Sequence, residues 1–321
     1  MSWDITVVGP LNLDLLITGD GPLDWEAITA WAGPANIEMT AAGAVGYTVQ
    51  NLARLGLKVA VSSCVPDDPL GAFILEALRQ EGVEGRFVRR VANTVGGIAV
   101  YMLLFGSRKR PLAYRLPTHE PWPARYTPAE VEALLQARLL HHGGYLHFKQ
   151  AWHGFTVDLF REAKSRGLIT TLDPQFPLFA MEPPWLPALA DLLSFVDLLL
   201  CDDYEARQLT GETDLAEAAQ RLLEAGPKTI VIKRGADGST VYQADYCYTQ
   251  PAITLGEVVD TIGAGDAYDA AFLLGALEGW PLERRALFAS VAAGFTVTGA
   301  GGSQTMPGRA QVETKMRDID A

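Results

Sequence analysis

Short apolar runs alternate along the chain with longer segments in which apolar residues recur at helical spacing. The apolar runs, which predict buried strands, lie at residues 5–8, 59–61, 145–148, 168–172, 196–200 and 229–232. The segments with helical spacing, which predict helices, lie at residues 45–55, 68–82, 156–166, 215–225, 264–278 and 282–297. Because the two kinds of segment alternate, we expect an α/β protein with a mostly parallel sheet covered by helices on both faces.

Residues 93–116 depart from this alternation. They contain two extended segments separated by a Gly-Ser-Arg-Lys turn at residues 106–109, and this pattern predicts a hairpin rather than a helix. Elsewhere the helix ends are marked by capping residues. Asp67 or Asp68 can cap the helix predicted at 68–82, and Gly82 follows its last turn.

The composition and charge of the chain restrict its partners. Of its 321 residues, 49% are hydrophobic, so the chain can bury a large core. Its 38 acidic and 26 basic residues give a formal charge of −12, which disfavours broad attraction to nucleic acid or to an anionic membrane. A bound phosphate must therefore be held by local groups.

The cysteines and the apolar runs favour a cytoplasmic protein. Cys64, Cys201 and Cys247 are widely separated and form no CxxC pair, which suits reduced thiols better than disulfides. The longest apolar stretch, residues 98–105, is far shorter than the roughly 18 to 20 residues that a membrane helix needs. The first residues also lack the basic and apolar regions of a signal peptide.

Small residues precede the helix predicted at 264–278. Gly263, Ala264 and Gly265 leave backbone N–H groups uncovered where the helix begins, and free amides together with the helix dipole favour an anion there. Asp266 lies in the first turn beside them and can accept a proton, as phosphoryl transfer requires. The segment therefore predicts a phosphate site with its own base, although an ordinary acidic residue in a first turn is the simpler alternative.

Two further carboxylates flank this segment. Asp269 lies three residues after Asp266, close enough to share a helix face, and is more simply a structural carboxylate. Asp260 can be a cation ligand, a partner for the loop or a turn residue, and the sequence leaves these three possibilities open.

Residues 260–272 resemble the C-terminal signature of the ribokinase family, the phosphofructokinase-B (PfkB) type of carbohydrate kinase. Four more segments resemble family motifs in the expected order, at residues 7–17, 41–56, 199–211 and 231–242. The resemblance implies a three-layer α/β/α ribokinase-like sandwich, formed as one domain by residues 1–321. It also implies a small β lid made of about residues 11–42 and 92–118.

The resemblance also implies a reaction, the transfer of the γ-phosphate of ATP to a hydroxyl of a sugar or sugar-like molecule, assisted by Mg²⁺. In this reaction Asp266 would deprotonate the acceptor hydroxyl. The amides of Gly263, Ala264 and Gly265 would hold the charge of the transferred phosphate.

On the acceptor side, the resemblance implies that Asn12 and Asp14 bind substrate hydroxyls and that Gly43 lets the backbone approach the substrate. From the residues alone, Asn12 and Asp14 can equally be loop residues that cap nearby backbone. Tyr47 stands where the family commonly has an asparagine, and Ala42 replaces the first glycine of a pair. Because a bulky phenol replaces a short amide, we expect a substrate other than free ribose bound in the standard way.

On the nucleotide side, the resemblance implies that Glu205 acts with Mg²⁺ and phosphate. Asp202 replaces an asparagine there and adds negative charge, unless a cation or Lys233 offsets it. Lys233, Gly235 and Gly238 would lie near the nucleotide. Asp260 would help to hold a monovalent cation, with Gly301 and Thr305 in a later loop near that site.

Two alternatives remain open. A nucleoside kinase of the same fold would use Tyr47 to stack a base, whereas a non-catalytic ligand-binding sensor would have kept the fold without the reaction. The intact segment 263–266 and Asp260 argue against the sensor. A homodimer formed through exposed lid strands is possible, because open strand edges pair readily.

Two weaker signals favour ordinary structural roles. His141, His142, His147 and His153 follow no zinc spacing, so we expect no metal site there. Lys149 is better read as a surface residue than as a ligand for an acidic substrate group.

Overall fold

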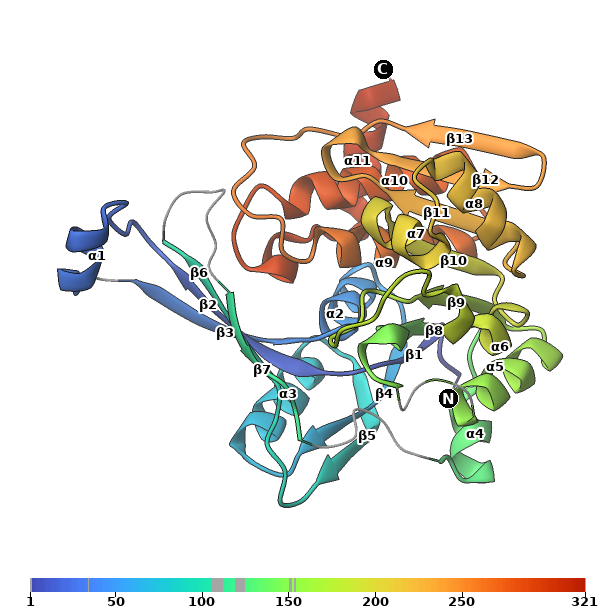
Figure 1. The fold of residues 1–321 in the computed structure, drawn as a ribbon, viewed down its shortest axis with the longest axis horizontal. Coiled ribbons are helices and arrows are strands. Elements are labelled where there is room, and N and C mark those ends of the chain that lie inside the picture. The colour runs from blue at the N-terminus through green and yellow to red at the C-terminus, as the bar shows by residue number, and fades with distance from the viewer. Residues whose placement is uncertain are drawn as a thin grey trace.

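A nine-stranded sheet forms the body of the molecule in the computed structural model (Figure 1). The structure describes residues 2–33, 35–104, 112–118, 125–149, 152 and 154–320. The strand order is β13-β12-β11-β10-β9-β8-β1-β4-β5, and every neighbouring pair from β5 to β11 is parallel. The last two strands, β12 and β13, pair antiparallel at one edge. The strands are β1 Ile5–Val8, β4 Val59–Pro66, β5 Glu84–Val91, β8 Leu139–Gly143, β9 Ile169–Asp173, β10 Leu198–Asp202, β11 Thr229–Lys233, β12 Ser239–Gln243 and β13 Tyr246–Gln250.

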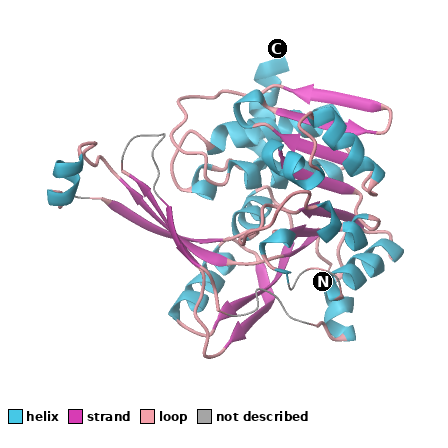
Figure 2. Ribbon diagram, in the orientation of Figure 1, coloured by secondary structure: helices cyan, strands magenta, loops and turns pink. Residues whose placement is uncertain are grey.

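Helices cover both faces of this sheet, which gives three layers (Figure 2). One layer comprises α2 Gly46–Arg54, α3 Pro69–Gln80, α9 Ala264–Leu277, α10 Leu282–Thr296 and α11 Arg309–Asp320. The other comprises α4 Pro128–Leu134, α5 Phe155–Ser165, α6 Ala190–Leu193, α7 Asp203–Thr210 and α8 Leu215–Glu224. Alternate residues of each buried strand supply the two layers. In β10, for example, Leu198 and Leu200 belong to one apolar cluster and Leu199 to the other.

A second sheet of four strands projects from one side of the body (Figure 1). Its order is β3-β2-β6-β7, with β2 Asn12–Thr18, β3 Asn36–Ala42, β6 Ile98–Leu103 and β7 Leu112–Arg115; α1 Trp25–Ala30 lies at its tip. Strands β6 and β7 pair antiparallel, as the predicted hairpin requires, while its turn at 106–109 lies outside the described residues. The sheet is built from the two segments expected to form a lid, and its action as a lid stays a prediction.

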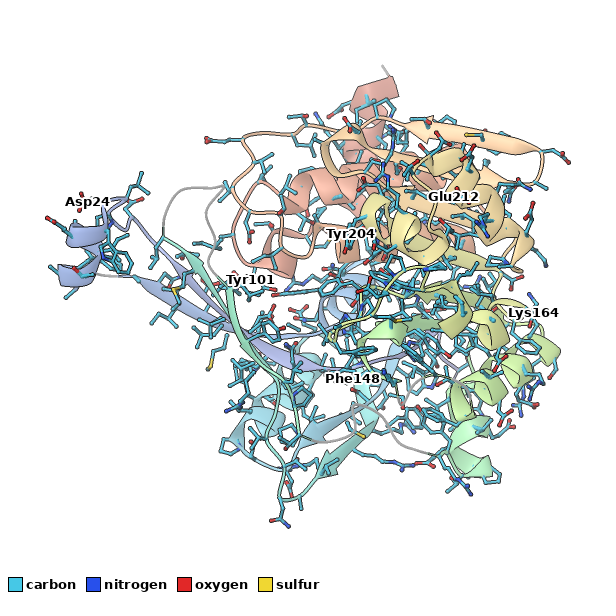
Figure 3. All side chains as sticks on the ribbon, in the orientation of Figure 1. Asp24, Tyr101, Phe148, Lys164, Tyr204 and Glu212 are labelled. Atoms are coloured by element: carbon cyan, nitrogen blue, oxygen red, sulfur yellow. The ribbon has the colours of Figure 1, made fainter. Side chains whose placement is uncertain are left out.

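The register of this second sheet separates two faces. Asp14 lies opposite Thr40 and Ala99, and on the same face Leu16 packs with Tyr47, Ile262 and Tyr101. Figure 3 shows Tyr101 between this sheet and the body. The opposite face, which we call the outer lid face, carries Leu15, Ile17, Ile37, Met39, Val100 and Met102.

Most predicted elements appear within a few residues of their expected bounds, and one strand was predicted in the wrong place. Residues 145–147 form a single 3₁₀ turn, η1 Tyr145–His147, and the strand is β8, which directly precedes it. Gly144 separates the two because its φ of 71° is left-handed and ends the extended backbone. The hydrophobic pattern did not reveal β8 because His141 and His142 are polar residues, although both are buried in this strand.

Local chemistry fixes the helix ends. Asp68, rather than Asp67, caps α3 by accepting hydrogen bonds from the N–H groups of Leu70 and Gly71, at 2.9 and 3.0 Å.

Helix α9 is mostly apolar on every side and its residues 267–277 are buried, so it lies in the interior of the molecule. Among the described residues, no helix is long and apolar enough to cross a membrane.

Candidate active site

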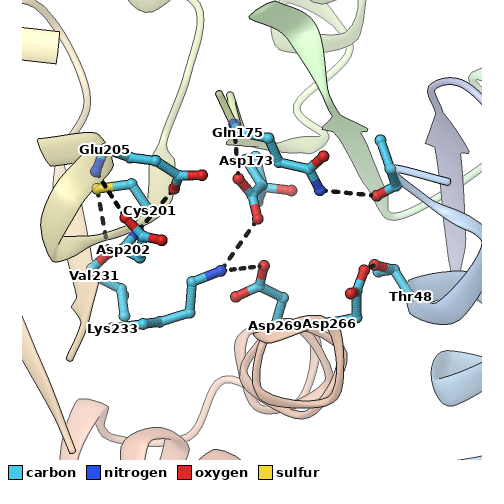
Figure 4. A network of polar contacts seen from close by, with 12 residues as sticks. Thr48, Asp173, Gln175, Cys201, Asp202, Glu205, Val231, Lys233, Asp266 and Asp269 are labelled. Carbon is cyan, nitrogen blue, oxygen red and sulfur yellow. Dashed lines mark hydrogen bonds and ion pairs between the residues drawn. The ribbon is translucent and has the colours of Figure 1, made fainter. Parts of the chain in front are cut away.

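Charged side chains gather at the carboxyl ends of neighbouring parallel strands (Figure 4). Asp173, Asp202 and Lys233 are the last residues of β9, β10 and β11, which lie side by side in the sheet. Parallel strands bring their carboxyl ends to one edge, where α/β proteins commonly bind ligands. The beginning of α9 lies at this same edge.

The beginning of α9 leaves backbone amides without partners. Gly263 is its N-cap, with a left-handed φ of 73° and no side-chain capping bond. The N–H of Ala264 already donates to the carbonyl of Thr261 at 3.3 Å, so this amide is partly used by the turn. The N–H groups of Gly263 and Gly265 have no partner in the part of the chain that the structure describes. Both remain available to an anion.

Space and positive charge adjoin this turn. A Cβ atom built on Gly265 would meet only Nζ of Lys233, at 3.8 Å. Gly265 therefore leaves room for a group the size of a phosphate oxygen beside an ammonium group. This arrangement neutralises anionic charge locally, in a protein whose formal charge is −12.

Asp266 lies in the first turn of α9 and is held from the opposite side by α2. The hydroxyl of Thr48 donates a hydrogen bond to its Oδ1 at 2.6 Å. Burial raises the pKa of Asp266 to about 6, while Thr48 and Lys233 oppose that rise. The carboxyl group is therefore mainly ionised at neutral pH and able to accept a proton.

Asp14 and Tyr47 form a buried pair near Asp266. The phenol of Tyr47 donates to Oδ2 of Asp14 at 2.9 Å, and each residue is only 4% exposed. Burial raises the pKa of Asp14 to about 7; the bond from Tyr47 lowers it and the charge of Asp266 raises it further. Asn12 lies beside them, and its buried Oδ1 has no hydrogen-bond partner in the described chain.

Gly43 is required at its position. A Cβ there would approach the carbonyl oxygen of Pro10 to 2.7 Å and Oδ1 of Asn12 to 2.9 Å, and the φ of Gly43 is 93°. The structure thus brings together all four residues predicted to contact the acceptor, namely Asn12, Asp14, Gly43 and Tyr47. Their role in binding remains a prediction.

Lys233 is enclosed by acidic groups. Its Nζ lies 2.8 Å from Oδ2 of Asp269 and 3.1 Å from Oδ2 of Asp173 (Figure 4). Burial alone would lower the pKa of Lys233, but Asp173, Asp269 and Glu205 together raise it well above its ordinary value. Burial also raises the pKa of Asp269; Lys233 lowers it, and the neighbouring carboxylate of Asp173 raises it further. Asp269 therefore fixes Lys233 rather than facing solvent.

Asp202 and Glu205 close the first turn of α7. The N–H of Glu205 donates to Asp202 Oδ1 at 2.7 Å, and the N–H of Asp202 donates to Glu205 Oε2 at 2.8 Å, which is a capping box. Burial raises the pKa of Glu205 to about 8, and the neighbouring Asp173 and Asp202 raise it too. Asp202, which stands where the family motif has an asparagine, therefore still caps α7.

These carboxylates suit a cation that arrives with its own ligands. The described residues contain no group of three or more His, Cys, Asp or Glu side chains arranged to hold a metal. Four carboxylates nevertheless surround one ammonium group, those of Asp173, Asp202, Glu205 and Asp269. Mg²⁺ commonly takes one or two protein carboxylates and completes its shell with phosphate oxygens and water. The donor set therefore fits Mg²⁺ bound together with a nucleotide.

A late loop joins Asp260 to the second sheet. Asp260 is 3% exposed, accepts a bond from the N–H of Ile262 at 3.1 Å, and contacts the N–H of Gly301 at 3.5 Å. In the same loop, a Cβ on Gly302 would lie 2.6 Å from the ring of Tyr47, so the ring packs directly on this glycine. Gln304 donates to Glu38 of β3 at 2.5 Å.

The remaining predicted residues have local partners. Thr305 donates to the carbonyl of Thr296 at 2.7 Å, close to the Asp260 loop. Gly235 and Gly238 form the turn between β11 and β12, with left-handed φ values of 54° and 83°. A Cβ on Gly238 would collide with the carbonyl oxygen of Gln250 at 2.0 Å, so this position needs glycine for the fold itself.

The histidines and the cysteines have structural surroundings. His141 is buried and its Nδ1 bonds with the hydroxyl of Thr171 at 2.9 Å. Burial lowers the pKa of His141 to about 4, that of His142 to about 3 and that of His147 to about 4, so all three are neutral. His153 lies outside the described residues.

Lys149 is exposed and lies over the ring of Phe179. The three cysteines are free thiols.

Sequence reasoning missed two residues of the site, Thr48 and Asp173. A charged residue that closes an apolar strand immediately before Pro174 was a usable signal for Asp173, because such residues face the ligand edge of a parallel sheet. Thr48 offered no comparable signal, since its partner Asp266 is 218 residues away.

Comparisons with known proteins show which family the chain belongs to. The sequence model described as "pfkB family carbohydrate kinase" matches residues 5–309. Ribokinase of Arabidopsis thaliana is 28% identical, over 96% of this chain and 79% of the relative. The 2-dehydro-3-deoxygluconokinase of Thermoproteus tenax is 28% identical, over 96% of this chain and 95% of the relative.

Solved structures agree at the level of the fold. A provisionally named ribokinase II of E. coli, solved with ATP and Mg²⁺, superposes with a TM-score of 0.78 at 20% identity, covering 98% of this chain and 99% of that one. This likeness confirms the predicted ribokinase-like α/β fold. Because the family model spans nearly the whole sequence, the chain belongs to the pfkB family of carbohydrate kinases, which confirms the predicted class of enzyme, an ATP-dependent carbohydrate kinase.

Proposed function

We propose that the protein transfers the γ-phosphate of ATP to a hydroxyl of a sugar or sugar-like molecule, with Asp266 as the base. One observation carries this proposal. Three groups lie close together, namely the uncapped amides at the start of α9, the carboxyl of Asp266 and the ammonium of Lys233. Phosphoryl transfer needs little more from a protein than positioning, charge neutralisation and a proton acceptor.

The chemical step balances with these groups. The acceptor hydroxyl gives its proton to Asp266 while its oxygen forms a bond to the γ-phosphorus, and the bond from that phosphorus to the β,γ-bridging oxygen breaks to release ADP. The amides of Gly263 and Gly265, with a smaller part for Ala264, stabilise the charge of the transferred phosphate. Lys233 adds positive charge at the same point.

The nucleotide and its cation belong on the side of β10 and β11. Glu205, with Asp202 behind it, would hold Mg²⁺, which supplies charge neutralisation on the phosphates. Lys233 and the turn of Gly235 and Gly238 would border the nucleotide. Support comes from the carboxylate excess around Lys233 and from the E. coli relative solved with ATP and Mg²⁺. Asp260, buried between two loops, remains the candidate for a monovalent cation.

The acceptor binds on the side of β2 and α2. The unpartnered Oδ1 of Asn12 and the remaining lone pairs of Asp14 would accept hydrogen bonds from substrate hydroxyls, and Gly43 leaves the backbone open to the substrate. Relatives are named for ribose and for 2-dehydro-3-deoxygluconate. Because Tyr47 already occupies one oxygen of Asp14, the acceptor of this protein differs from ribose held in the standard way.

The two rival functions are less well supported. A nucleoside kinase would need the ring of Tyr47 free to stack on a base, but this ring is buried and packs on Gly302. A sensor without activity would have no use for an ionised carboxylate held beside open amides.

A panel assay separates the three functions. ADP release is measured with ribose, fructose 6-phosphate, 2-dehydro-3-deoxygluconate and adenosine as acceptors. Turnover of a sugar or sugar acid supports the proposal, and turnover of adenosine alone supports the nucleoside kinase. Ligand binding without turnover of any acceptor supports the sensor.

Asp266→Asn tests the base. We expect turnover of the best acceptor to fall by about 100-fold or more, because general-base catalysis typically contributes at least that much. We also expect kcat/KM of the wild type to fall as the pH drops below about 6, since the raised pKa of Asp266 leaves it protonated there. A variant that keeps more than roughly a tenth of wild-type turnover would show that another group is the base.

The assembly and cellular location are also proposals. We infer that the outer lid face pairs with that of a second copy, because its six side chains are apolar and Ile37 is 62% exposed. The cytoplasm is the proposed location, and three free thiols are in keeping with it.

A further inference from the structure

Thr48 makes an unusual contact for a hydroxyl residue at the start of a helix. It is the third residue of α2, it is 2% exposed, and its Oγ1 lies 2.6 Å from Oδ1 of Asp266. Threonine in such positions often bonds within its own turn. The carbonyl of Ala44, four residues before Thr48, instead accepts a bond from Gln175 at 3.1 Å. The hydroxyl of Thr48 is directed across to α9.

This contact makes the two oxygens of Asp266 unequal. Oδ1 receives a short hydrogen bond from a neutral donor, while Oδ2 accepts no hydrogen bond from any other residue that the structure describes. A carboxyl group held by one oxygen cannot rotate freely about its terminal torsion, which is otherwise broad. The free oxygen therefore has a fixed direction.

The neighbouring residue makes the matching contact on the acceptor side. Tyr47 donates to Asp14 at 2.9 Å, and Thr48 donates to Asp266 at 2.6 Å. Two successive residues of one rigid helical turn thus fix both the proposed ligand for the acceptor and the proposed base. Their separation is set by α2 rather than by a flexible loop.

We propose that Thr48 is a positioning residue that holds Oδ1 of Asp266, so that Oδ2 is the oxygen that receives the proton of the acceptor hydroxyl. The inference rests on the proposed function, because it presumes that Asp266 is the base. Thr48 itself touches neither substrate in this proposal and acts only through Asp266.

Thr48→Val removes the hydroxyl and keeps the shape of the side chain, and Thr48→Ser restores the hydroxyl. We expect Thr48→Val to lower kcat by roughly tenfold to a hundredfold, the range for one hydrogen bond to a charged group. The KM values for ATP and for the best acceptor of the panel should stay close to those of the wild type. Thr48→Ser should recover most of the lost kcat, which loss of packing alone would not predict.

The pH dependence gives a second readout. The bond from Thr48 stabilises the ionised form of Asp266, so its removal raises the pKa and moves the acid limb of the kcat profile to higher pH. The other groups that act on Asp266 are unchanged in Thr48→Val; they include Lys233 on β11, Asp173 on β9 and Asp14 on β2. The carboxyl ¹³C resonance of Asp266, titrated in the protein without any substrate, reports the same shift directly.

The possible outcomes separate the two proposals. If Thr48→Val leaves kcat and the titration of Asp266 unchanged while Asp266→Asn is inactive, Thr48 has no positioning role. If Asp266→Asn keeps its activity, the proposed base is wrong whatever Thr48 does. Thr48→Val should have no further effect in an Asp266→Asn background, and an additive loss there would overturn the inference as well. An unfolding temperature of Thr48→Val equal to that of the wild type would show that the variant keeps the fold.

Discussion

At the scale of one residue, the burial of Asp14 in the proposed acceptor site affects the stability of the protein. Its carboxyl group is 4% exposed, and burial raises its pKa from 3.8 to about 7. A group with a raised pKa in the folded state adds stability below its unfolded pKa, and this contribution is lost as the pH rises through the folded pKa. Above about pH 7 the folded protein therefore carries a buried charge that disfavours folding.

Asp14→Asn should be more stable than the wild type at pH 8. Asparagine cannot ionise, yet its side-chain oxygen still accepts the bond from Tyr47. We expect a gain of a few kcal/mol in the free energy of unfolding, since each pKa unit corresponds to about 1.4 kcal/mol. The gain should shrink towards zero near pH 4, and activity should fall at every pH.

Urea denaturation at pH 4, 6 and 8 measures this difference. Asp20→Asn, at an exposed position just after β2, is the control for an exposed carboxylate. An equal loss of stability at all three pH values would mean that Asp14 makes a structural contact that asparagine cannot replace.

At the scale of elements, α9 depends on the glycine at its start. Gly263 has a φ of 73° and Gly279, just after the other end, has a φ of 68°. Alanine at either position is strained by about 1 to 2 kcal/mol, because the left-handed region crowds a Cβ. Only Gly263 lies at the open amides of the proposed phosphate site.

Gly263→Ala and Gly279→Ala therefore form a matched pair. Both should lower the free energy of unfolding by about 1 to 2 kcal/mol. Gly263→Ala should also raise the KM for ATP or lower kcat by roughly tenfold or more, because the amides are reoriented, whereas Gly279→Ala should keep wild-type kinetics. If Gly263→Ala and Gly279→Ala have the same kinetic constants, the start of α9 does not bind the phosphate.

The sequence predicted those elements whose signals are local. Helices α2, α3, α5, α8, α9 and α10 appear near their predicted bounds because caps, glycines and helical spacing all lie within the segment. Strand β8 was misplaced because its two histidines are buried by the tertiary structure and not by their own polarity.

The same distinction applies to the site. Motif resemblance named Asp14, Tyr47 and Asp266, and the structure brings them close together. It gave no indication that Tyr47 bonds to Asp14, that Thr48 holds Asp266 or that Asp173 pairs with Lys233. Each of these contacts joins segments far apart in the chain, so only the packing of α2, α9 and the sheet determines them.

At the scale of the whole molecule, the second sheet has one apolar face that is partly exposed. The inner face packs towards the body through Leu16 and Tyr101, whereas the outer lid face is exposed at the end where Ile37 and Met39 lie. Ile37 is 62% exposed and Met39 is 49% exposed. A monomer with this face open to water would tend to associate.

Ile37→Lys combined with Met39→Lys should convert a dimer into a monomer. Two buried charges on a self-complementary face oppose each other across the symmetry axis. Light scattering coupled to size-exclusion chromatography gives the mass of the wild type and of the variant. Ile319→Lys on α11, where the isoleucine is 41% exposed, is the control and should leave the mass unchanged. A monomeric wild type would contradict the inferred pairing.

The bond between Gln304 and Glu38 joins parts of the chain that are 266 residues apart. It can therefore form only late in the synthesis of the protein. A ribosome exposes Asp14 and Tyr47 well before Asp266 and the loop of Gly302 emerge. At roughly 5 to 20 residues per second, this delay is on the order of ten to forty seconds. During that time the nascent chain lacks the proposed base Asp266 and the loop that contacts Tyr47 and Glu38. Under the proposed function, activity therefore cannot begin before the segment from Asp266 to Gln304 has been synthesised and has reached the second sheet.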